Sequence, residues 1–152
     1  MTHPLRRTLD VAAAGEKELE VLYKRWSQHA PTARTMALLA EMGAAERGHH
    51  EMLLHISPAE ILPKRVDPRA GDAVLDFLVD VPLPGGELSQ DAIAAATRRE
   101  AALAALYEFL AGLGGEAGPL FRALAAEEQR HDRLLRTEVH AAVDTFPKRG
   151  CT

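Results

Sequence analysis

Two Glu-x-x-His steps, one in each half of the chain, restrict the possible folds of this sequence more than any other feature. They are Glu46-Arg47-Gly48-His49 and Glu128-Gln129-Arg130-His131. Positions three apart lie on the same face of a helix that has 3.6 residues per turn. Each step on a helix therefore places a carboxylate beside an imidazole, a pair that can bind one metal ion or one edge of a metal pair.

Apolar residues recur at steps of three and four along most of the chain, which predicts an all-α protein. Aromatic residues make up only 5% of the sequence, and β-branched residues rarely occur in runs, which agrees with this prediction. Thr32 is the expected N-cap of the second helix, and Ser89 or Asp91 that of the third. The predicted helices cover residues 5–29, 33–56, 89–111 and 119–144.

The two halves of the chain repeat one helical hairpin. Glu16 and Glu100 each precede a tyrosine by seven residues, and each precedes the glutamate of a Glu-x-x-His step by about 30. In an antiparallel hairpin, residues equidistant from the turn lie at the same height. The midpoints between the paired glutamates are Pro31 and Gly114, both helix breakers, so each hairpin is expected to bring its two glutamates level.

Residues 57–88 are rich in proline and form the one long irregular stretch. A connection of this length is unusual between adjacent antiparallel helices but suits a crossover that runs along a bundle. We therefore expect one domain over residues 1–152, a four-helix bundle of two hairpins joined by a long crossover.

Four carboxylates and two imidazoles lie on stripes that are otherwise apolar, so they are expected to point into the core. Unpaired buried carboxylates would cost several kcal/mol each. Two divalent cations would balance the four negative charges, and neutral histidines would add ligands without charge. The pattern predicts a dinuclear site with the ligands Glu16, Glu46, His49, Glu100, Glu128 and His131.

One Glu from each of two helices and a Glu-x-x-His step from each of the other two is the arrangement of carboxylate-bridged di-metal bundles. In that arrangement Glu46 and Glu128 would bridge the metals, and His49 and His131 would each cap one. The outer pair, Glu16 and Glu100, would be terminal or bridging ligands. Glu127 also has a same-face spacing to His131, but the stripe through Phe121 and Leu124 favours Glu128.

Across residues 8–140 the chain resembles the rubrerythrin branch of the ferritin-like superfamily. The segments that carry the resemblance are 15–23 (GEKELEVLY), 45–49 (AERGH), 99–100 with 106–107, and 127–131 (EEQRH). The resemblance implies a non-haem centre of two iron ions that reacts with peroxide or dioxygen. Carboxylate-rich ligation also admits manganese or zinc.

The sequence departs from rubrerythrin proper at two points. A rubredoxin-like segment with paired Cys-x-x-Cys steps is not expected here, because Cys151 is the single cysteine, so an external reductant would be needed. The third helix has Leu103 where rubrerythrins place an extra glutamate, and the redox-linked movement of one iron depends on that glutamate. Metal binding is therefore a firmer expectation than peroxidase activity.

Three functions remain open from the sequence. The first is a di-iron redox enzyme that reduces peroxide or oxidises Fe(II), and the second is an iron-handling protein without turnover. The third is a metal-binding structural or interaction bundle. Tyr23 and Tyr107 either hydrogen-bond a ligand carboxylate and shield the metals or simply pack in the core.

Composition restricts the partners and the location. The net charge of −4 argues against nucleic acid, and no apolar run reaches the roughly 20 residues of a membrane span. The polar N-terminus predicts a cytoplasmic protein. A homodimer is expected, with Val21, Leu22 and Trp26 as candidates for its apolar face.

Overall fold

In the computed structural model the chain forms a bundle of four long helices, which confirms the predicted fold class. The structure describes residues 3–58 and 86–145, together with residues 67, 69, 72, 75, 76, 78 and 83 between them. These residues contain no β-strand. The helices are α1 (Arg6–His29), α2 (Ala33–His55), α5 (Gln90–Gly112) and α6 (Gly118–Leu134), followed by the π-helical segment η1 (Leu135–Val139) and α7 (His140–Thr145).

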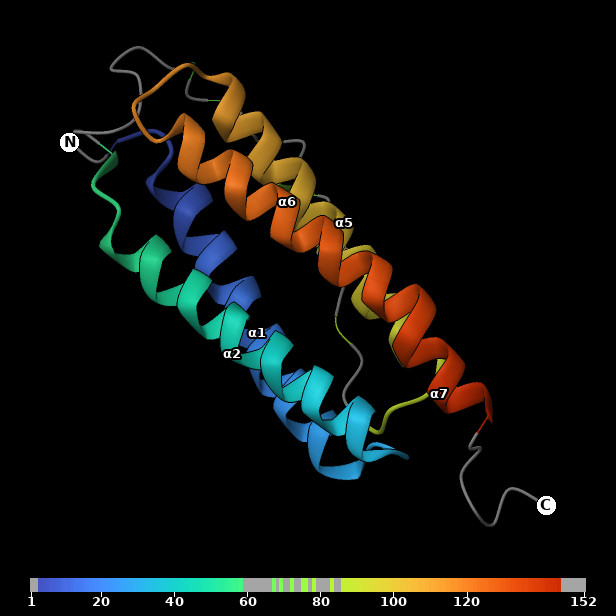
Figure 1. The fold of residues 1–152 in the computed structure, drawn as a ribbon. Coiled ribbons are helices and arrows are strands. Elements are labelled where there is room, and N and C mark those ends of the chain that lie inside the picture. The colour runs from blue at the N-terminus through green and yellow to red at the C-terminus, as the bar shows by residue number, and fades with distance from the viewer. Residues whose placement is uncertain are drawn as a thin grey trace.

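Each half of the chain folds as an antiparallel hairpin, α1 with α2 and α5 with α6 (Figure 1). The Thr32 side chain accepts a hydrogen bond from the Thr35 amide and caps α2, and Ser89 caps α5 in the same way. The turn after α5 contains Gly114 with φ of +78°, a conformation that favours glycine. Both predicted midpoints, Pro31 and Gly114, lie in the turns between the paired helices.

Most of the predicted crossover, residues 57–88, falls outside the described residues. Its described ends lie at opposite ends of the bundle (Figure 1). His50 near the end of α2 donates a hydrogen bond to the Ala13 carbonyl in the first half of α1. Trp26, near the end of α1, donates one to the carbonyl of Gly86, just before α5. The described residues on the two sides of this connection therefore lie near opposite ends of α1.

The fourth helix is not the uninterrupted α-helix that the sequence pattern predicts. Its backbone widens to a π-helix over Leu135–Val139 before α-helical geometry returns at His140. The Thr137 hydroxyl donates to the Arg133 carbonyl, one of the side chain-to-backbone bonds that compete with a regular helical ladder. Leu135 and Val139 are both buried, so the segment still packs against the core.

The core corrects one prediction about the surface. Leu22 and Trp26, expected on an apolar face for a second copy, are buried within the chain, and of the three candidates only Val21 is exposed. Their apolar contacts are made inside the bundle, because α1 faces both α2 and α5. Among the described residues, no helix combines the length and apolarity that crossing a membrane would need.

Gly48 lies in the interior of α2 without a packing reason. A Cβ added there would meet no atom within 4 Å, whereas one added at Gly43 would contact the α1 backbone at Glu20 and Lys24. Since glycine costs a helix interior about 1 kcal/mol relative to alanine, Gly48→Ala is expected to raise the free energy of unfolding by 0.5–1 kcal/mol, roughly. Urea unfolding measures the change in free energy. A loss of stability would show that the backbone at position 48 requires glycine.

Candidate metal centre

All six residues expected to bind metal lie inside the bundle, midway along the helices. Glu16, Glu46, Glu100, Glu128 and His131 have no exposed surface, and His49 is 4% exposed. Each helix contributes at the position that its stripe predicts. Glu16 comes from α1, Glu46 and His49 from α2, Glu100 from α5, and Glu128 and His131 from α6.

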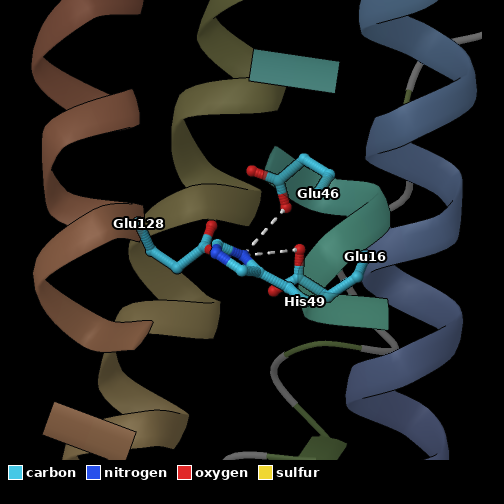
Figure 2. Close-up of side chains that lie close together, drawn as sticks. All are labelled: Glu16, Glu46, His49 and Glu128. Carbon is cyan, nitrogen blue, oxygen red and sulfur yellow. Dashed lines mark ion pairs between the residues drawn. The ribbon is translucent and has the colours of Figure 1, made fainter. Parts of the chain in front are cut away.

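The six side chains form two overlapping groups of four, each compact enough to bind one ion. One group consists of Glu16, Glu46, His49 and Glu128 (Figure 2). The other consists of Glu46, Glu100, Glu128 and His131. Within each group the candidate ligand atoms all lie within 4.8 Å of one another. Glu46 and Glu128 belong to both groups, which is the position of bridging carboxylates between two ions.

The histidines point the same ring nitrogen, Nδ1, at the carboxylates. His49 Nδ1 lies 2.7 Å from Glu128 Oε1 and 3.5 Å from Glu16 Oε2. His131 Nδ1 lies 2.5 Å from Glu46 Oε1 and 3.5 Å from Glu100 Oε1. Each imidazole thus faces the shared glutamate of the other hairpin. It also faces the outer glutamate of its own hairpin, which is Glu16 for His49 and Glu100 for His131.

Several buried oxygens at the centre of the cluster have no hydrogen-bond donor among the described residues. They are Glu16 Oε2, Glu46 Oε2, Glu100 Oε2 and both carboxylate oxygens of Glu128. Buried polar atoms are nearly always hydrogen-bonded, because leaving one unsatisfied costs about 1–3 kcal/mol and more when it is charged. Oxygen and imidazole donors arranged in this way fit hard or borderline divalent cations.

Tyr23 and Tyr107 hydrogen-bond the cluster in a crossed pattern. Tyr23 on α1 donates to Glu100 Oε1 on α5, and Tyr107 on α5 donates to Glu16 Oε1 on α1, each at 2.6 Å. Burial, followed by the nearby carboxylates, raises the pKa of both tyrosines well above the usual value, so both stay protonated as donors. Each bond orients the carboxylate of the opposite hairpin, and the other oxygen of that carboxylate is buried without a hydrogen-bond partner among the described residues.

Glu127 has a contact that the sequence did not predict. It lies outside both groups, and its Oε2 is 2.7 Å from Nε2 of His49, the ring nitrogen that faces away from the cluster. The side chain of Glu127 is 45% exposed. Sequence spacing related this glutamate only to His131 on its own helix. The contact with α2 depends on how the two hairpins pack, for which the sequence carries no local signal.

Two neighbours of the clustered residues lie as follows. His50, next to His49, is half-buried, and its Nδ1 donates to the Ala13 carbonyl of α1. Leu103, one turn after Glu100, is fully buried and apolar, so α5 offers a single carboxylate to the cluster. Cys151 lies outside the described residues.

The cluster retains protons when it lacks metal. Burial and the charges of Glu100 and Glu16 raise the pKa of Glu128 well above its usual value. Burial opposes protonation of His49, but its contacts with Glu16 and Glu127 outweigh burial and raise its pKa to about 9. A metal ion that binds here must displace these protons, so affinity is expected to rise with pH.

This linkage predicts a pH-dependent gap between the unfolding free energies of the metal-loaded and the metal-free protein. The raised pKa of His49 stabilises the metal-free fold fully below pH 6.5, and that stabilisation is lost as pH rises towards 9. Metal replaces the proton, so the gap should widen between pH 6.5 and pH 8.5, by about 1.4 kcal/mol per pH unit per displaced proton. Calorimetry with Mn(II) measures it, and a constant gap would contradict the proton displacement.

Comparison with known proteins agrees with this geometry. The family model described as Rubrerythrin matches residues 7–139, a range that includes all six clustered side chains and both tyrosines. Searches of curated proteins and of solved structures found no match.

Proposed function

The chain belongs to the rubrerythrin family, and we propose that it is a non-haem di-iron protein that reduces peroxide or oxidises Fe(II). The observation that carries the proposal is the pair of four-residue groups that share Glu46 and Glu128. A site for one ion would need neither the second histidine nor the second pair of carboxylates. Two divalent ions would balance the four carboxylates in a core that excludes water.

The donor set supports iron as the resident metal. Carboxylates and imidazoles suit iron and manganese, and zinc can occupy the same ligands. Bound iron would supply the electrons for peroxide reduction, two per peroxide molecule, which with two protons yields two water molecules. Glu46 and Glu128 would hold both ions, His49 and His131 one each, and Glu16 and Glu100 would complete the two ends.

The surrounding residues prepare the centre for this chemistry. Tyr23 and Tyr107 orient the two outer carboxylates and, as buried phenols beside the centre, can shield it from stray radicals. Burial of every proposed ligand excludes bulk water and strengthens the electrostatic interactions within the site. With Leu103 in place of a further carboxylate, we propose that both ions keep the same ligands in both oxidation states.

One experiment separates peroxide reduction from Fe(II) oxidation. The protein is loaded anaerobically with two equivalents of Fe(II), and hydrogen peroxide is titrated in. Oxidation of both irons by one peroxide molecule, followed by continued peroxide consumption with a small-molecule reductant, supports a peroxidase. Rapid oxidation of excess Fe(II) by dioxygen, without turnover on reductant, supports a ferroxidase. Failure to bind iron, or bound iron that neither oxidant oxidises, would overturn the proposal.

The alternative is an iron-handling or structural bundle in which the six side chains bind metal without turnover. It predicts stoichiometric binding and no reaction with either oxidant. We further propose that the protein acts as a homodimer in the cytoplasm and receives electrons from an external donor. Sedimentation of the purified protein tests the dimer.

A further inference from the structure

The two halves of the centre are nearly symmetric, but they differ in the residue that lies behind each histidine. The two tyrosine–glutamate bonds are both 2.6 Å, and each histidine Nδ1 lies 3.5 Å from its outer glutamate. The repeat pairs Glu46 with Glu128, so the residue before each of them is also paired. In one half that residue is Glu127, and in the other it is Ala45.

This difference changes the hydrogen-bond partner of Nε2, the ring nitrogen of each histidine that faces away from the cluster. His49 Nε2 contacts the Glu127 carboxylate at 2.7 Å, so with a metal bound this nitrogen would keep its proton while Nδ1 presents its lone pair to the ion. His131 is buried, and its Nε2 has no hydrogen-bond partner among the described residues. Ala45 offers no polar side-chain atom in the matching place.

A carboxylate behind a metal-bound histidine fixes the tautomer and the ring orientation and raises the basicity of the ligand. Loss of such a partner typically lowers metal affinity 10–100-fold. Among the described residues, only His49 of the two proposed ligand histidines has such a partner. The His131 ring must find its orientation from packing and from Glu46 and Glu100 alone.

We infer that Glu127 is a positioning residue that makes the His49 position the tighter of the two, so that the ions bind in order, first at His49 and then at His131. The inference rests on the proposed dinuclear site and adds an inequivalence that the six ligands alone would not create. The side chain of Glu127 is half-exposed, so we expect a difference near the lower end of the range, about tenfold.

Stepwise addition of Zn(II) to the metal-free protein tests the order, with the ring nitrogens of both histidines followed by NMR. Zn(II) is redox-inert, so the readout does not depend on turnover. In the wild-type protein the His49 signals should change with the first equivalent and the His131 signals with the second. In Glu127→Ala this order should be lost, with the His49 position weakened about tenfold and the His131 position changed less than threefold.

Three further variants separate positioning from charge and folding. Glu127→Gln keeps an amide oxygen that can accept a hydrogen bond from His49 Nε2–H and should retain part of the preference. Glu41→Ala removes an exposed carboxylate, which pairs with Arg130 at 3.6 Å, and should leave the order unchanged. Ala45→Glu would add the missing partner behind His131 and should reduce the preference. Circular dichroism confirms that each variant is folded.

The outcomes distinguish this inference from the proposed function. If both histidines respond to Zn(II) together in the wild-type protein, or if Glu127→Ala keeps the order, the inference is wrong while the dinuclear site stands. If neither histidine responds to excess metal, the metal centre and the inference both fail.

Discussion

Replacing Glu46 with glutamine is expected to reduce the metal content from two ions per chain to at most one. Glu46 belongs to both groups of candidate ligands, and its two oxygens face different parts of the cluster. A neutral amide has one oxygen and no charge, so it cannot bridge two cations as a carboxylate can. The rate of peroxide reduction or Fe(II) oxidation should fall by at least about 100-fold. Loss of a residue that only hydrogen-bonds a metal ligand typically lowers activity by about 10–100-fold, and loss of a ligand should exceed this.

Elemental analysis after Fe(II) loading and gel filtration measures the stoichiometry, and stopped-flow absorption measures the reaction. Glu41→Gln is the matched control, since Glu41 lies on the same helix but is exposed. It should keep two ions and full activity. Two tightly bound ions in Glu46→Gln would show that Glu46 does not bridge.

Replacing Glu128 with methionine is expected to stabilise the metal-free fold while it destroys metal binding. Both Glu128 carboxylate oxygens are buried without a hydrogen-bond donor among the described residues, and burial raises the pKa of the group. Exchange of a buried ion pair for apolar residues of similar size often stabilises a protein by about 1–4 kcal/mol, whereas removing one partner of a matched pair is destabilising. We expect a net gain at the lower end of that range without metal, because the burial of Glu128 and its repulsion by Glu100 and Glu16 outweigh its contact with His49 Nδ1 at 2.7 Å.

The same variant should lose the stabilisation that metal gives to the wild-type protein. A ligand at 1,000 times its dissociation constant adds about 4 kcal/mol, and Glu128→Met removes a ligand that both ions share. Urea unfolding with and without Mn(II) measures both effects. Glu41→Met should change neither by more than about 0.5 kcal/mol, as is usual for exposed positions. A metal-free Glu128→Met protein less stable than the wild type would mean that the carboxylate is structural.

The fold and the six clustered residues could be predicted because their signals are local and repeated. Helical periodicity placed Glu16, Glu46, Glu100 and Glu128 on inward stripes, and the turns at Pro31 and Gly114 set the heights at which they meet. The caps at Thr32 and Ser89 follow from side-chain chemistry within one turn. Such features do not depend on how one hairpin lies against the other.

The features that could not be predicted depend on packing between elements. The contact of Glu127 with His49 joins two hairpins, and nothing in the spacing of either helix specifies it. Leu22 and Trp26 are apolar residues beside the main stripe, and only the position of neighbouring helices decides that they are buried. The π-helical turn at Leu135–Val139 keeps buried residues four apart, so the apolar pattern reads as an ordinary helix.

Anomalous diffraction at the iron absorption edge, from crystals of protein loaded anaerobically with Fe(II), tests the metal centre most directly. Two peaks per chain should lie between Glu46 and Glu128, one beside His49 and Glu16 and the other beside His131 and Glu100. A single peak, or iron bound elsewhere while these six side chains bind none, would contradict the dinuclear centre.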